Sequence, residues 1–493
     1  MALRNKPLWA IFLVYMLVSG YTMTHHEPWG DEVFTWNIAK SSGTYPQLIE
    51  NRKFEGHPPA WVTILWLISK CTHNVRYMQL AQWVIACLVA GLILFYSPFP
   101  TPTKALACFG YYFLFEYAVL SRNYGTAMLL ICCICIVLKK DFRYKTLLYY
   151  ILLFLLSNVH LLATLLAASL HLYFLQSYTS KKKLLIHTLT GGLLLLPAVI
   201  FILPPSDSTI DIGHSLRQWN IHLLTATIEG PLRAFLPVQA WWNYHFWNTE
   251  FLVEAKAEYS FLKVLNLLIM TGLMAIAFFI FRKNRKSLIL FGASLLLYLL
   301  LSASVFPLTS ARYAGFIFIS FFVACWLHYY EQPLSAASRK LLDSLLAIQF
   351  AAGIFAVTRD IRLPFSNLYR IDELAREVPP RSRLVTDYWT MNGYVAYLDT
   401  PAYCIDVGRE LSFVTWGPDI TVIQNNPHRY TSGADKLFQQ ERKQEIYMIS
   451  SGSPQTLDQA DSCFSRSFHV RLIDKREGAI EKGGNLYLYK ITK

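Results

Sequence analysis

FEGHPPAWVTILWL (residues 54–67) decides the topology that we predict for this chain. Its apolar run is shorter than the roughly 20 residues that a membrane-spanning helix needs, and it starts at a Pro-Pro pair. If 58–71 crossed the bilayer, with the N-terminus inside, the basic stretches KKDFRYK (139–145), SKKK (180–183) and RKNRK (282–286) would all face outward. Lys and Arg prefer cytoplasmic loops. We therefore predict that 58–71 is a helix on the outer surface of the membrane.

The composition predicts an integral membrane protein. Of the 493 residues, 54% are hydrophobic and 16% charged, and the apolar residues form long uncharged blocks. About 11 blocks are candidates for spans by length: 7–23, 78–96, 105–120, 124–138, 146–160, 161–178, 184–203, 261–281, 287–304, 313–328 and 340–358.

The formal net charge of +13 does not indicate a nucleic-acid partner. The basic clusters, Arg339 with Lys340 included, lie between hydrophobic segments, as expected of cytoplasmic loops. The surplus of positive charge therefore reports the orientation of the chain in the bilayer.

An odd number of spans places the C-terminus on the outer face. We predict a membrane domain over 1–359, with outer loops at 24–77 and 204–260, and a soluble extracytoplasmic α/β domain over 360–493. In that domain, helical spacing at 367–378 is followed by strand-like stretches at 383–389, 394–398, 445–450 and 485–491. It contains no phosphate loop, metal-spaced His/Cys cluster or nucleophile elbow. Cys404 and Cys463 lie within it, and spacing alone leaves a disulfide between them open.

Five segments place ionisable residues at the outer ends of the predicted spans. These residues are Asp31 and Glu32 in HHEPWGDE, Glu55 and His57 in KFEGHPP, Arg122 and Tyr124 in SRNY, His160 in SNVHLL, and Arg312 in TSARY. Each has an ordinary structural explanation: Asp31 as the N-cap of a helix, an arginine reaching to lipid headgroups, a histidine packed in a core. Ionisable groups gathered at membrane level nevertheless indicate a functional site.

The residue types at this site indicate a chemistry. Arginine suits a phosphate, which it binds with paired donors. A carboxylate suits a general base that takes the proton of an attacking hydroxyl or amine. A base beside phosphate-binding arginines at the lipid surface predicts a lipid-linked phosphate as one substrate.

In the order GDE, FEGHPP, SRNY, a later histidine and ARY, the chain resembles membrane glycosyltransferases of the GT-C superfamily. It is most similar to bacterial relatives of the protein O-mannosyltransferases, which use dolichyl-phosphate mannose, and of the lipid A aminoarabinose transferases. The resemblance covers about residues 1–360. It implies a GT-C fold and a bacterial cytoplasmic membrane with the site facing the periplasm; an endoplasmic reticulum enzyme facing the lumen would have the equivalent topology.

The resemblance also implies roles for individual residues. Asp31 is the expected catalytic base with Glu32 as its orienting or metal-binding partner, and Arg122 and Arg312, with Tyr124, would bind the donor phosphate. Glu55 matches a position that binds a divalent metal ion in the aminoarabinose transferases, and His57 stands where those enzymes often carry lysine. The loop 204–260 would close over the substrates; its candidate residues are Arg217, Trp219, Arg233, Trp241, Trp242 and His245.

We therefore predict an inverting glycosyltransferase that moves a sugar from a polyprenyl-phosphate donor to a lipid, glycan or protein acceptor. Three alternatives stay open: a polytopic transporter or flippase, a glycan-binding scaffold without catalysis, and transfer of a group other than a sugar. The transporter would favour internal repeats and polar residues at mid-membrane. Transfer of another group would favour a nucleophilic Ser or Thr and a metal cluster in the soluble domain.

Overall fold

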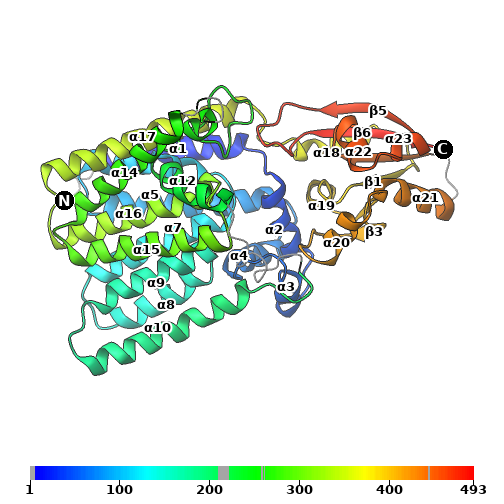
Figure 1. Ribbon diagram of the computed structural model, residues 1–493. Coiled ribbons are helices and arrows are strands. Elements are labelled where there is room, and N and C mark those ends of the chain that lie inside the picture. The colour runs from blue at the N-terminus through cyan, green and yellow to red at the C-terminus, as the bar shows by residue number, and fades with distance from the viewer. Residues whose placement is uncertain (1–5, 209–220, 257–258, 260, 442–444) are drawn as a thin grey trace.

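A computed structural model describes residues 6–208, 221–256, 259, 261–441 and 445–493. A bundle of helices forms one end of the molecule, and a small domain built on a β-sheet forms the other (Figure 1). The chain is a helical membrane protein with a C-terminal sheet domain, as predicted.

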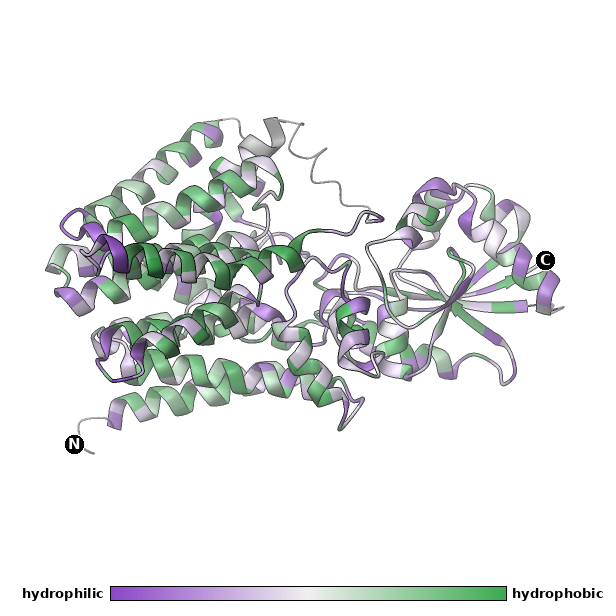
Figure 2. Ribbon diagram, turned by 90° about the horizontal axis from the view of Figure 1, so that it is seen from below, coloured by the Kyte–Doolittle hydropathy of each residue, from purple (hydrophilic) through white to green (hydrophobic). Residues whose placement is uncertain are grey.

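Among the described residues, seven helices are long and apolar enough to cross a membrane. They are α1 (Lys6–His25), α5 (Arg76–Tyr96), α10 (Lys181–Ile202), α14 (Phe261–Phe281), α15 (Arg285–Ser304), α16 (Ala311–Glu331) and α17 (Ala336–Arg362). Figure 2 shows them coloured mostly as hydrophobic. The predicted domain boundary at 359/360 falls in the last turn of α17.

Burial separates the central helix of the bundle from a peripheral one. In α16 every residue from Ala314 to Leu327 is buried, whereas Leu189 and Leu193 of α10 are 64% and 70% exposed. Leucine exposed to this extent on a helix this apolar is expected to face lipid hydrocarbon. α16 is therefore the centre of the bundle, and its N-terminal end carries Arg312.

Three shorter apolar helices also belong to the bundle: α7 (Asn123–Lys139), α8 (Lys145–Ser157) and α9 (Leu161–Leu175). The segment predicted as one span at 105–120 is not a single helix. It consists of the end of α6 (Thr101–Cys108), a turn at Phe109 and Gly110, and the π-helix η2 (Tyr112–Glu116). The total of about 11 crossings thus stays a prediction.

The interruption lies where α17 approaches the backbone of this segment through Gly353. A Cβ atom on Gly353 would lie 2.7 Å from the Phe109 carbonyl oxygen and 3.1 Å from the Tyr111 backbone nitrogen. Backbone atoms cannot rotate away as a side chain can. The close contact between α17 and the 109–111 turn therefore requires glycine at 353.

We expect Gly353→Ala to destabilise the bundle by about 1–3 kcal/mol, because the added methyl group forces α17 away from the turn. Thermal unfolding, followed by a thiol-reactive dye that labels the buried cysteines as they become exposed, measures the effect. Gly272→Ala in α14 is the matched control, since a Cβ there has no neighbour within 4 Å. Alanine is the better helix former by about 1 kcal/mol, so the control should be neutral or stabilising. Equal melting temperatures for the two variants would contradict the steric argument.

The two ends of the bundle carry different residues. Helix α1 begins at the end away from the sheet (Figure 1), and Lys139, Lys145 and Lys286, from two of the basic connectors, line one cavity. The helices α2 (Gly30–Lys40), α3 (Tyr45–Asn51) and α4 (Ala60–Ser69) lie at the opposite end, beside the sheet domain. The basic connectors and the helices α2, α3 and α4 therefore lie at opposite ends of the bundle, as predicted.

The helix α4 occupies the segment that decided the predicted topology. Its 10 residues span about 15 Å, half of the hydrocarbon core. It packs on α2 through buried Trp61, Val62 and Leu65, and the Ala60 amide donates to the Asn158 carbonyl over 3.0 Å. His25 at the end of α1 and Arg76 at the start of α5 line the same cavity. The chain between these two helices therefore starts and finishes at the same end of the bundle.

The segment predicted as the second outer loop is more embedded than expected. It contains α12 (Ile221–Phe235) and the short α13 (Phe251–Ala255). Leu232, Ala234 and Phe235 of α12 are buried, and Gln349 of α17 donates to the Ala234 and Phe235 carbonyls over 3.0 and 3.1 Å. Part of this loop therefore packs inside the bundle.

The C-terminal domain contains a six-stranded sheet of order β3-β2-β1-β4-β6-β5. Its elements are η3 (Leu368–Arg370), α18 (Ile371–Arg376), β1 (Arg383–Thr386), α19 (Met391–Leu398), β2 (Ala402–Cys404), β3 (Arg409–Leu411), α20 (Pro418–Asn425), α21 (Arg429–Glu441), β4 (Glu445–Ser450), α22 (Pro454–Ala460), α23 (Phe464–Ser467), β5 (His469–Arg476) and β6 (Leu486–Thr492). β1 is parallel to β2 and β4, and the remaining pairs are antiparallel.

One predicted strand of this domain is wrong. Residues 394–398 belong to the helix α19, which packs against α2: Asn37 Nδ2 donates to the Asn392 carbonyl over 2.8 Å, and Lys40 Nζ lies 2.7 Å from Asp399. A short apolar run cannot be assigned to helix or strand by periodicity alone. Cys404 and Cys463 are both free thiols, so no disulfide joins them.

Candidate functional site

Asp31 lies in the first turn of α2, with its carboxylate beside two arginines. Arg312 Nη1 donates to Asp31 Oδ2 over 3.2 Å, and Arg122 Nη2 lies 4.0 Å from the same oxygen. Arg122 Nη1 also donates to the Asp31 carbonyl oxygen over 2.5 Å. The N-cap of α2 is Trp29, so capping does not account for Asp31. Its side chain is 35% exposed, against 7% for Arg122 and 15% for Arg312.

Arg312 is held among aromatic rings. Its guanidinium carbon lies 4.8 Å from the ring centre of Tyr313, 5.0 Å from that of Trp29 and 5.6 Å from that of Trp247. Cation–π contacts of this kind fix the plane of the cation. In the part of the chain that the structure describes, the buried Nε atoms of Arg122 and Arg312 have no hydrogen-bond partner. Each arginine therefore has one N–H donor that the protein leaves unsatisfied.

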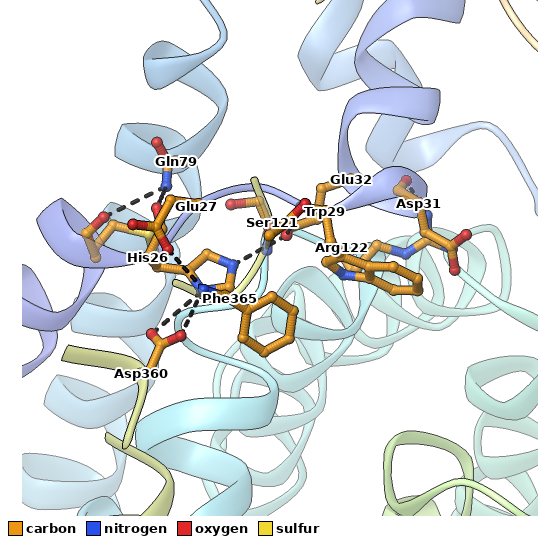
Figure 3. Close-up of polar contacts among 12 residues, drawn as sticks. His26, Glu27, Trp29, Asp31, Glu32, Gln79, Ser121, Arg122, Asp360 and Phe365 are labelled. Atoms are coloured by element: carbon orange, nitrogen blue, oxygen red, sulfur yellow. Dashed lines mark hydrogen bonds and ion pairs between the residues drawn. The ribbon is translucent and has the colours of Figure 1, made fainter. Parts of the chain in front are cut away.

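The side chain of Glu32 turns away from Asp31 and is fully buried (Figure 3). Its carboxylate accepts hydrogen bonds from the Trp29 amide over 3.1 Å and from the Ser121 amide over 2.5 Å. His26 Nε2 lies 3.0 Å from it, and His26 Nδ1 lies 3.1 Å from Asp360 of α17. These contacts fix the start of α2 and the residue before Arg122. The predicted role of Glu32, as an orienting or metal-binding partner of Asp31, stays a prediction.

Glu55 and its neighbours lie beside Arg122. Thr35 Oγ1 donates to Glu55 Oε1 over 2.9 Å, and Arg122 Nη1 donates to Thr35 over 3.3 Å. Burial raises the pKa of Glu55, although the Arg122 charge opposes the shift. Arg52 is also buried, with Nε and Nη1 unpartnered among the described residues. Sequence reasoning overlooked this third arginine, although it lies three residues before Glu55.

The rings of His57 and His160 are in contact, with centres 4.6 Å apart and planes tilted by 39°, and Tyr124 lies 5.1 Å from the His160 ring. Burial, helped by nearby arginines, lowers the pKa of His57 far below its usual value and that of His160 to about 3. Both imidazoles are therefore neutral at physiological pH. With Glu55, Phe306 and Ile202, they line an almost wholly apolar cavity of about 160 Å³.

The residues around Glu55 do not fit a metal ion held by the protein. Within the described ranges, the one group of three possible ligands lying within 4.8 Å of one another is His428, Asp461 and Cys463, in the C-terminal domain. Glu55 and His57 belong to no such group. Asp461 already accepts the Thr431 and Cys463 amides, which explains its burial without a metal.

Asp31 opens into a cavity of about 320 Å³ between α2 and the C-terminal domain. The far wall carries Trp389 and Trp416, which are 46% and 38% exposed with ring centres 5.5 Å apart. Glu481 also lines the cavity, and burial, reinforced by the Asp31 charge, raises its pKa. Sequence analysis assigned no role to these three residues, because no local sequence pattern shows that they meet at this cavity.

The second outer loop reaches the site through Trp247, whose ring contacts Arg312. Arg217 and Trp219 lie outside the described residues. Arg233 is buried and lies 3.8 Å from Glu229, four residues earlier in α12, and the described contacts do not link its side chain to Asp31. His245 Nδ1 lies 3.0 Å from the Ile480 carbonyl oxygen, which places this loop against the segment that carries Glu481.

The structure thus brings Asp31, Arg122 and Arg312 into one cluster and arranges Glu55, His57, Tyr124 and His160 behind the two arginines. It adds Arg52, Trp389, Trp416 and Glu481. Comparison with protein-family models finds none that matches the chain, and comparison with curated proteins finds no match. Its function is therefore argued from the chemistry of this site.

Proposed function

We propose that the protein is an inverting glycosyltransferase of the GT-C type that uses a polyprenyl-phosphate sugar. The observation that carries this proposal is the position of Asp31: a partly exposed carboxylate beside the buried Arg122 and the largely buried Arg312, in the wall of an aromatic-lined cavity. An apolar cavity lies nearby, lined by His57 and His160. The first cavity suits a sugar and its acceptor, and the second suits the beginning of a hydrocarbon chain.

The donor phosphate would bind to Arg122 and Arg312 through their free Nε donors. Two arginines offer several charge-assisted hydrogen bonds to phosphate oxygens. His57 and His160 are neutral, so the positive charge that attracts the phosphate comes from the arginines. The apolar cavity beside the two histidines would take the first isoprene units. Trp389 and Trp416 would pack against the sugar ring.

The reaction is a single displacement. The acceptor hydroxyl or amine gives its proton to Asp31 and attacks the anomeric carbon, while the bond from that carbon to the phosphate oxygen breaks and its electrons pass to the phosphate. Arg122 and Arg312 stabilise the charge that develops on the leaving phosphate, as preorganised donors do at other transition states. The products are the glycosylated acceptor, with inverted configuration, and the polyprenyl phosphate.

The proposal includes the orientation of the protein in the membrane. With about 11 crossings and the basic connectors on the cytoplasmic side, Asp31 and the C-terminal domain face the periplasm of a bacterial inner membrane. Lipid-linked donors are accessible there without a nucleotide. The acceptor is a lipid, glycan or protein, and its nucleophilic group enters from the open side of the 320 Å³ cavity.

The test is transfer of labelled sugar in membranes that contain the protein, compared with membranes that lack it. The donor panel contains polyprenyl-monophosphate sugars, polyprenyl-diphosphate sugars and nucleotide sugars. We expect label to move from a monophosphate donor alone, into a product with inverted anomeric configuration. Retained configuration would contradict the single displacement. Movement of intact donor across the bilayer without transfer would favour the transporter.

A further inference from the structure

A second polar cavity lies on the other side of His26 from Glu32. Its volume is about 430 Å³, and His26, Glu27 and Asp360 form one of its walls (Figure 3). No residue that lines it also lines the Asp31 cavity. The Asp360–His26–Glu32 chain separates the two, so this cavity is distinct from the candidate active site.

The charged side chains of this cavity that have no ion-pair partner among the described residues are positive. Arg76 at the start of α5 and Arg362 at the end of α17 line it, are exposed, and form no ion pair within the described ranges. The two carboxylates on its wall are already engaged. Glu27 accepts the Phe365 amide over 2.8 Å, and both oxygens of Asp360 lie within 3.2 Å of His26 Nδ1.

Two buried polar atoms on the wall are unsatisfied. The Tyr397 hydroxyl and Asn367 Oδ1 have no hydrogen-bond partner among the described residues, although both side chains line the cavity. A buried polar atom without a partner lowers the stability of the protein, because it has lost its hydrogen bonds to water. A ligand that accepts from Tyr397 and donates to Asn367 would remove that cost, which is the behaviour of a phosphate ester with a hydroxyl or amino group.

An apolar groove continues from this cavity along the outside of the bundle. It has a volume of about 350 Å³, runs between α1 and α5, and is lined by Gly20, Met23, Leu80 and Trp83. Thr24, Arg76 and Gln79 line both the groove and the polar cavity. The neighbouring faces of α1 and α5 are lipid-facing, with Leu17 63% and Val84 45% exposed. The polar cavity therefore lies where the headgroup of a lipid seated in the groove would be.

We infer that this cavity and groove form a binding site for an anionic phospholipid, separate from the donor site. The phosphate lies between Arg76 and Arg362 and accepts from Tyr397, a hydroxyl of the headgroup donates to Asn367, and one chain follows the groove to Trp83. The proposed transfer reaction uses none of these residues. A lipid bound there would brace the junction of α1, α5 and α17 behind Glu32.

The test measures lipid binding to the purified full-length protein. Native mass spectrometry gives the affinity for phosphatidylglycerol, for phosphatidylcholine and for glycerol phosphate without chains. We expect one tight phosphatidylglycerol site that the double variant Arg76→Gln/Arg362→Gln weakens by at least about ten-fold, since it loses two charge-assisted contacts. The control Lys263→Gln/Arg339→Gln removes the same charge from exposed positions elsewhere and should bind as wild type does.

A second measurement does not depend on the arginine variants. Phosphatidylglycerol with brominated chains should quench part of the tryptophan fluorescence, and Trp83→Phe should remove that part. Equal affinity in wild type and the arginine variant, or equal affinity for phosphatidylcholine, would overturn an anionic site. Glycerol phosphate that binds as tightly as the lipid, or quenching unaffected by Trp83→Phe, would overturn the placement of the chain in the groove.

Discussion

Replacing Asp31 with asparagine lowers the rate of sugar transfer by roughly 10²–10⁴-fold, the range that a positioned general base contributes. Asparagine has the same size, and its carbonyl oxygen still accepts from Arg312 at the position of Oδ2. It does not take a proton from the acceptor. The loss therefore falls on kcat, while binding of the donor, which depends on Arg122 and Arg312, changes little.

The matched control is Glu50→Gln, which removes an exposed carboxylate from α3 in the same segment between α1 and α5. It should transfer sugar at the wild-type rate. Asp31→Glu keeps the carboxylate but displaces it by one methylene from its place beside Arg312, so it should retain only part of the activity. Full activity of Asp31→Asn in correctly folded protein would remove Asp31 from the mechanism. If the same variant lost donor affinity instead of kcat, Asp31 would be a binding residue.

The cluster around Asp31 was accessible from sequence because topology alone brings its members together. Asp31, Arg122 and Arg312 each lie within a few residues of the same end of an apolar helix, and a bundle collects such ends at one surface. The spacing of residues in the sequence could not predict the direction of each side chain. Asp31 and Glu32 are adjacent, yet one faces the arginines and the other packs against His26 and Ser121.

The residues that sequence analysis missed come from the docking of distant segments. Trp389, Trp416 and Glu481 reach the Asp31 cavity only because α19 packs on α2, and no local pattern encodes that contact. The same docking explains the wrong strand at 394–398, whose apolar residues face α2 and the sheet. The broken helix at 105–120 was also not predicted, and the residue that packs against the break, Gly353, lies more than 200 residues later.

Replacing His26 with glutamine destabilises the protein by about 3–5 kcal/mol, the cost of removing one member of a buried ion pair. His26 lies between two carboxylates, 3.0 Å from Glu32 and 3.1 Å from Asp360, and all three side chains are inaccessible to solvent. Glutamine leaves two buried carboxylates without a cation between them. The midpoint of thermal unfolding, followed by dye labelling of the buried cysteines, should fall accordingly.

The destabilisation should also depend on pH. Burial alone would lower the pKa of His26, but the charges of Asp360 and Glu32 outweigh it and raise the pKa well above its usual value of 6.5. The folded protein therefore holds a proton that the unfolded chain releases above about pH 6.5. The stabilisation is fully present below that pH and is lost as pH rises through the raised pKa. The difference in stability between wild type and His26→Gln should thus be largest near pH 6 and shrink in alkaline solution.

His73→Gln is the matched control, because His73 forms an exposed pair with Asp399, at 3.0 Å with both side chains about half exposed. An exposed pair contributes at most about 1 kcal/mol, so this variant should unfold close to the wild-type temperature. A His26→Gln variant as stable as His73→Gln would mean that Glu32 and Asp360 do not need a cation between them. A difference that grew with pH would mean that His26 is neutral in the folded protein, and the start of α2 would then be held by the Trp29 and Ser121 amides alone.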